Sequence, residues 1–93
     1  MNNAIREILR TIPSNHIFDT HFVINFLIKE YSDEYLQFAA RYANSNQITL
    51  TTHGQIGQII SSFQGDLVEQ LDPPAWSENI HWKASPCACW RKL

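Results

Sequence analysis

The chain has 93 residues, of which 44% are hydrophobic and 12% aromatic, and these values predict one compact domain spanning residues 1–93. Its formal net charge of −2 argues against a protein that coats nucleic acid through bulk positive charge. No apolar run reaches the roughly eighteen residues needed to cross a bilayer, and Met1–Asn15 lacks the pattern of a signal peptide. We therefore expect a cytoplasmic protein with no membrane partner.

The first predicted element is a helix that ends near Ile12. Its apolar residues share one face, Asn2 or Asn3 can cap its start, and Pro13 ends it. After a polar turn, the apolar pair Ile17–Phe18 is long enough for a short strand but not for another helix.

Two further helices are predicted in the middle of the chain. Asp19 is placed to cap a helix over Thr20–Glu30, which is apolar around most of its circumference and should form the centre of the core. Ser32 opens the next segment, Asp33–Ala43, whose first residues are acidic and so favour the positive end of a helix.

The segment Thr51–Gln64 is predicted to be a helix with one apolar and one polar face. Ile48–Leu50 should form an extended connector before it, with Thr51 or Thr52 as the cap. The apolar face is formed by Ile56, Ile59, Ile60 and Phe63. The opposite face has no carboxylate and consists of His53, Gln55, Gln58, Ser61, Ser62 and Gln64. Gly54 and Gly57 leave room there for the backbone of a partner.

Strands are predicted in the last third of the chain. The spacing of apolar residues in Leu67–Leu71 and the alternation of Ile80–Ala84 both indicate extended structure, with a break at Pro73–Pro74. In a final strand, Cys87–Leu93, alternation places Cys87, Cys89 and Arg91 on one face. The expected fold class is α+β and mainly helical, with three to four helices followed by a C-terminal β-hairpin.

This order of elements resembles a winged helix-turn-helix domain over nearly the whole chain. The resemblance implies that helix 51–64 enters the major groove of double-stranded DNA and that a hairpin around Ser77–Ser85 contacts backbone or minor groove. The groove-facing positions of the helix would then be His53, Gln55, Gln58, Ser61 and Ser62. The hairpin would contribute Asn79, His81, Trp82 and Lys83, with Arg91 as a further basic contact. Two features depart from the family pattern, because helix 51–64 has no lysine or arginine and Asp33–Ala43 is an extra or displaced helix.

A metal site and an enzyme are alternatives that the sequence favours less. His53, His81, Cys87 and Cys89 include zinc-ligand types, but the Cys-x-Cys spacing differs from that of structural zinc sites. We therefore expect two reduced thiols, no metal and no cofactor. A Cys/His hydrolase would need an orienting carboxylate and an oxyanion loop, and no motif supplies them, so we expect a protein that is not an enzyme.

The main alternative to DNA binding is a protein-interaction domain, possibly a homodimer. Trp76, Trp82 and Trp90 all lie near the C-terminus, and exposed tryptophan is common at protein interfaces. We expect Trp90 to cover the helices and Trp82, beside Lys83, to be exposed.

Overall fold

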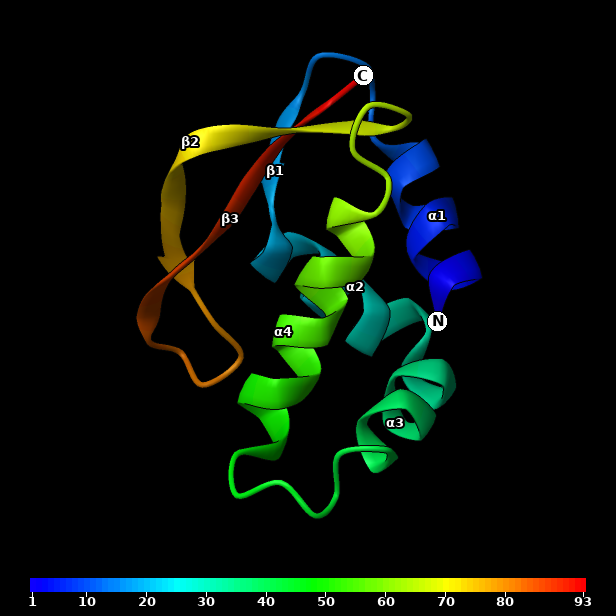
Figure 1. Cartoon of the computed structure of the whole chain (residues 1–93), viewed down its shortest axis with the longest axis vertical. Coiled ribbons are helices and arrows are strands. Elements are labelled where there is room, and N and C mark those ends of the chain that lie inside the picture. The colour runs from blue at the N-terminus through cyan, green and yellow to red at the C-terminus, as the bar shows by residue number, and fades with distance from the viewer.

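The computed structural model describes residues 1–93 and shows a small α+β fold with four helices and a three-stranded antiparallel sheet. The elements in chain order are α1 (Asn2–Thr11), β1 (Ile17–Asp19), α2 (Thr20–Glu30), α3 (Ser32–Ala40), α4 (Ile48–Ser61), β2 (Val68–Glu78) and β3 (Ala84–Lys92). The expected fold class, with its C-terminal β-hairpin, is confirmed. In Figure 1, α4 lies between the hairpin on one side and the helices α1 and α3 on the other. No helix combines the length and the apolar character needed to span a bilayer.

The sheet has the strand order β1-β3-β2, so β3 is central and β2 is an edge strand. Phe18 of β1 is aligned with Trp90 of β3, while Val68 of β2 is aligned with Lys92. The expected break at Pro73–Pro74 is wrong, because β2 continues through both prolines with a bulge between Leu71 and Ala75. An edge strand with a bulge tolerates proline because the missing N–H groups are not needed by a neighbouring strand.

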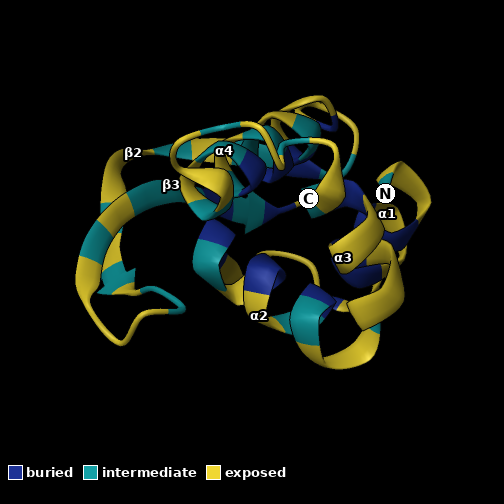
Figure 2. Cartoon of the chain, turned by 90° about the horizontal axis from the view of Figure 1, so that it is seen from below, coloured by how far each residue is buried: buried dark blue, intermediate teal, exposed yellow.

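The core forms where α1, α2, α4 and the inner face of β3 meet. The buried set includes Ile5 of α1, Leu27 of α2, Ile60 of α4 and Trp90 of β3, each at most 1% exposed. Figure 2 shows buried segments concentrated between the helices, while the hairpin is mostly exposed or half-buried. Its loop therefore presents several side chains to solvent.

The two N-terminal helices differ in how they begin. The Asp19 side chain accepts a hydrogen bond of 2.9 Å from the Phe22 backbone N–H, which confirms the predicted cap of α2. The predicted asparagine cap of the first helix is wrong, because α1 begins at Asn2 and Met1 is its cap residue, without a side-chain bond. Burial of the apolar stripe that includes Ile5 is enough to position this helix.

Helix α4 begins and ends earlier than the sequence predicts. It starts at Ile48, so the expected extended connector Ile48–Leu50 is helical instead. Gln47 is the cap residue, and the first turn of the helix is helical although Ile48 and Leu50 are exposed. The helix ends at Ser61, and Gly65 then adopts φ +86°, a left-handed conformation that suits glycine, as the chain turns into β2.

Two other boundaries also differ. The third helix ends at Ala40 and is followed by turns, whereas the sequence predicts helix to Ala43. The predicted strand over Ile80–Ala84 is mostly the loop of the hairpin, in which Trp82 has φ +64°. Apolar and polar residues alternate in this segment, but they lie in a loop and do not form the two faces of a sheet.

Candidate functional site

The outer face of α4 is polar and uncharged. Gln58, Ser61 and Ser62 are exposed, and Gln55 is half-buried. No Lys, Arg, Asp or Glu occurs between Arg41 and Asp66, so this face carries neither cation nor carboxylate. At the end of the helix, the hydroxyl of Ser62 donates its hydrogen to the Ile59 carbonyl, so it has no hydrogen left to donate to a partner.

His53 points away from this outer face and toward α3. Its Nε2 lies 2.8 Å from the hydroxyl of Tyr35. Burial, and then the nearby imidazoles of His21 and His81, lower the pKa of His53 to about 4. His53 is therefore neutral at pH 7 and lies half-buried beside α3, not on the groove-facing surface that was predicted for it.

The hairpin loop is organised by the side chain of Asn79. Its Oδ1 accepts hydrogen bonds from the backbone N–H groups of His81 (2.9 Å) and Lys83 (3.3 Å). Its Nδ2 donates to the Ser85 hydroxyl across the hairpin at 3.2 Å. A backbone bond of 2.9 Å from Asn79 N to the Lys83 carbonyl closes the loop. Asn79 thus holds the loop in shape, which is a different role from the groove contact predicted for it.

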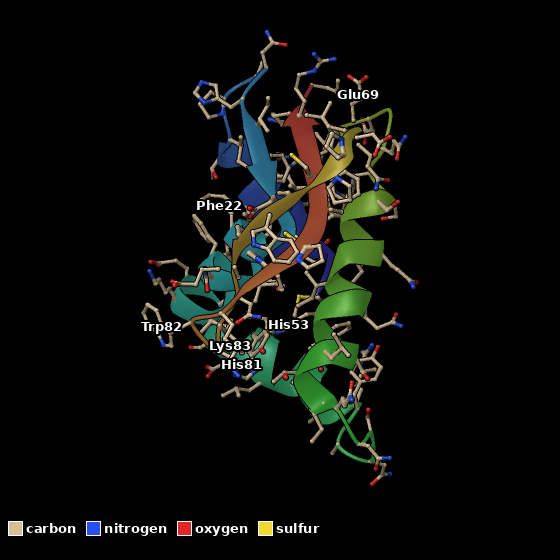
Figure 3. All side chains as sticks on the ribbon, turned by 90° about the vertical axis from the view of Figure 1, so that its left-hand side faces the viewer. Phe22, His53, Glu69, His81, Trp82 and Lys83 are labelled. Atoms are coloured by element: carbon tan, nitrogen blue, oxygen red, sulfur yellow. The ribbon has the colours of Figure 1, made fainter.

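The loop lies against the first turn of α4. The Nε2 atom of His81 is 3.4 Å from the hydroxyl of Thr49. Trp82 is 83% exposed and points away from α4, and Lys83 is exposed beside it (Figure 3). The structure therefore brings the hairpin loop and the start of α4 into one surface.

The predicted basic contact Arg91 lies elsewhere. Its guanidinium forms an ion pair with Glu69 on β2, and Glu69 and Lys83 lie at opposite ends of the hairpin (Figure 3). The neighbouring Lys92 is buried and its Nζ donates to the Ile12 carbonyl at 2.9 Å. These two cations stabilise the far end of the hairpin and do not join Lys83.

Arg6 is a cation near α4 that the sequence analysis did not assign to the site. Its guanidinium carbon lies 5.4 Å from the ring centroid of Phe63, just after the end of α4. Lys83 is in the loop at the start of α4, so one exposed cation lies toward each end of the helix. The helix itself is about 20 Å long.

A pocket of about 330 Å³ opens between α2, α4 and the hairpin. We call it the histidine pocket, and its 15 lining residues are Thr20, His21, Ile24, Thr49, Leu50, His53, Gly54, Gly57, Asn79, Ile80, His81, Ser85, Pro86, Cys87 and Ala88. None of them is Asp, Glu, Lys or Arg. The pocket thus combines apolar walls with three imidazoles.

Each imidazole of the pocket is held through one ring nitrogen by a different element. Nδ1 of His21 lies 2.7 Å from the Ser77 hydroxyl on β2. Nε2 of His53 contacts the Tyr35 hydroxyl on α3. Nε2 of His81 contacts the Thr49 hydroxyl on α4. The second nitrogen of each ring has no hydrogen-bond partner within the chain. It is available to a molecule that enters the pocket.

The two glycines of α4 also line this pocket. A Cβ atom at Gly57 would lie 3.8 Å from Cγ2 of Thr20, so this glycine faces α2 and does not leave space on the outer face. A Cβ atom at Gly54 would meet nothing within 4 Å. Glycine inside a helix costs about 1 kcal/mol relative to alanine, and no contact within the chain requires it at position 54.

Neither cysteine forms a disulfide, and both thiols are partly buried on β3. The Sγ atom of Cys87 lies 3.9 Å from the Ser77 hydroxyl. No three His, Cys, Asp or Glu side chains are close enough together to hold a metal ion. The zinc alternative built on His53, His81, Cys87 and Cys89 therefore has no geometric support.

Comparison of the chain with protein-family models, curated proteins and solved structures finds no match. The site must therefore be understood from its own residues. Sequence reasoning missed Tyr35 and His21, which lie far along the chain from His53. Only the role of Asn79 could be recognised from the neighbouring sequence, because asparagine in a short polar loop commonly bonds to the backbone that follows it.

Proposed function

We propose that this chain is a winged-helix-like module that binds double-stranded DNA, with α4 in the major groove and the hairpin loop on the sugar-phosphate backbone. The observation that carries the proposal is the contact between His81 and Thr49. It holds the loop beside the first turn of the helix that precedes the hairpin, so both elements can meet one partner together.

The chemistry of the surface also fits a duplex. Gln58 and Ser61 are exposed on α4, and amide and hydroxyl groups can read base edges or bind phosphate oxygens. No carboxylate on α4 would repel the backbone, and Lys83 and Arg6 would neutralise phosphates toward the two ends of the helix. With a net charge of −2 and few cations, the expected affinity is weak to moderate.

Three variants test this assignment through the fluorescence anisotropy of labelled duplexes. Lys83→Ala should weaken binding to every sequence and lower the salt slope by about one, because it removes one phosphate contact. Gln58→Ala should cost about 1–3 kcal/mol on a preferred site only. Arg91→Ala is the matched control, since it removes one positive charge from the opposite end of the same hairpin and should leave binding unchanged. Equal effects of Lys83→Ala and Arg91→Ala would contradict the proposed surface.

A second candidate function is binding to another protein or to a second copy of the chain. Its support is the exposure of large apolar side chains, which reaches 67% for Leu50, 71% for Trp76 and 83% for Trp82. Exposed tryptophans often become the centre of protein interfaces. Light scattering of the wild type and of Trp82→Ala tests the homodimer directly, because a dimer held by Trp82 should dissociate in the variant.

A further inference from the structure

We propose that the histidine pocket binds a small aromatic carboxylate, meaning a flat ring system that carries one anionic group. The pocket shares Thr49 and His81 with the proposed DNA-binding surface, but ligand binding there does not require DNA. Its volume of about 330 Å³ lies within the range of about 300–1,000 Å³ that is typical of pockets for small ligands. A second pocket of about 430 Å³ lies around β1, but it is lined by one histidine, whereas the histidine pocket has three.

The walls of the pocket fit a flat apolar body. Gly54 and Gly57 expose helix backbone on one side, without side chains that would divide the space. Ile24 and Ala88 supply apolar surface from α2 and β3. A Cβ atom at position 54 would meet nothing within 4 Å, so the space beside this glycine is open to a ligand.

The polar groups of the pocket fit an anion. His21, His53 and His81 each have one ring nitrogen fixed by the fold and one without a partner. No carboxylate lines the pocket to compete for these nitrogens. Burial and the neighbouring imidazoles lower the pKa of His53, so this residue is neutral at pH 7 in the empty pocket. A bound carboxylate would favour its protonated form.

A metal ion is a less suitable occupant. The three imidazoles line one pocket, but they are not close enough together to coordinate the same ion. Hydrogen bonds to Ser77, Tyr35 and Thr49 hold the rings apart on separate elements. A ligand several atoms wide can reach more than one of them, whereas a single ion cannot.

Titration with 2-naphthoate, followed by amide NMR shifts of the full chain without DNA, tests the proposal. We expect saturable shifts centred on Gly54, Gly57 and Ala88, with a Kd below about 1 mM. The uncharged isostere naphthalene-2-carboxamide should bind at least about tenfold more weakly, because it lacks the charge-assisted hydrogen bond. Absence of saturable shifts, or equal affinity for the acid and the amide, would overturn the proposal.

A pair of variants on α4 locates the binding site. Gly54→Leu places a side chain in the open space of the pocket and should weaken 2-naphthoate binding by about tenfold or more. Gln58→Leu adds the same side chain to the exposed face and should bind as the wild type does. Unchanged binding by a folded Gly54→Leu would overturn the assignment. If that variant does not fold, the comparison of acid with amide and the position of the shifts decide the question.

Discussion

The hydroxyl of Tyr35 on α3 lies 2.8 Å from Nε2 of His53 on α4, and this pair joins the two helices beside the histidine pocket. Burial raises the pKa of Tyr35, and burial with two nearby imidazoles lowers the pKa of His53 to about 4. Both side chains are therefore neutral at pH 7, and the imidazole tautomer decides which of them donates the hydrogen bond.

Acid should weaken the fold through His53. The unfolded chain takes up a proton at this residue below about pH 6.5, whereas the folded chain does so only near pH 4, so its contribution to stability is present above pH 6.5 and is lost as the pH falls toward 4. The full shift corresponds to about 2 kcal/mol between pH 7 and pH 5, and because water screens the partly exposed ring we expect about 1 kcal/mol. Urea unfolding of the wild type and of His53→Gln at both pH values measures this difference. A pH dependence shared equally by the variant would contradict it.

Loss of the Thr20 hydroxyl should destabilise the junction of α2 and the sheet. The indole N–H of the buried Trp90 donates to this hydroxyl at 3.2 Å, and the hydroxyl donates to the Ala88 carbonyl at 3.3 Å. Thr20→Val leaves a buried donor without a partner and should cost about 1–3 kcal/mol. Thr20→Ser keeps the hydroxyl and should cost less, as measured by chemical denaturation. If the two variants are equally stable, the hydrogen bond does not contribute.

The two faces of α4 should respond differently to truncation. Ile60 is fully buried, so Ile60→Ala should lower the free energy of unfolding by about 2–5 kcal/mol. Gln58 is exposed on the same helix, and Gln58→Ala should change it by less than about 0.5 kcal/mol. Denaturant melts of the two variants are compared directly. Similar losses would mean that the helix is oriented differently.

The hairpin loop should lose its shape when Asn79 is replaced. Its Oδ1 atom accepts two backbone hydrogen bonds, from His81 and Lys83, so Asn79→Ala leaves both donors to solvent. We expect faster amide hydrogen exchange at these two residues and little change in the core. Glu78→Ala, next to it on β2, is the matched control, because its side chain makes none of the bonds that close the loop. Unchanged exchange in Asn79→Ala would show that the backbone alone fixes the loop.

Local signals predicted α2 correctly. The boundaries of α2 follow from the Asp19 cap and from a continuous apolar segment, and both depend only on neighbouring residues. The start of α4 at Ile48 was not predictable in this way, because the local cap residues Thr51 and Thr52 lie inside the helix and Gln47, which makes no side-chain cap bond, precedes it. The Ile80–Ala84 segment has the alternation of a strand, yet the side chain of Asn79 turns it into a loop.

The candidate site was only partly accessible from the sequence. The polar face that includes Gln58 was visible as a helical pattern, and the loop position of Lys83 followed from the expected hairpin. The inward orientation of His53 and the ion pair of Arg91 with Glu69 depend on residues that are distant along the chain. The histidine pocket is lined by residues from α2, α4 and the hairpin, so no local sequence motif predicts it.

The binding of wild-type protein to random-sequence duplex DNA over a range of salt concentrations tests the proposed function most directly. If Lys83 and Arg6 each neutralise a phosphate, the logarithm of the association constant should fall linearly with the logarithm of salt concentration, with a slope of about −2. Binding should be clear at low ionic strength and weak near physiological salt. The absence of salt-dependent binding to any duplex at low ionic strength would contradict DNA binding, and would leave a protein contact centred on Trp82 as the better account.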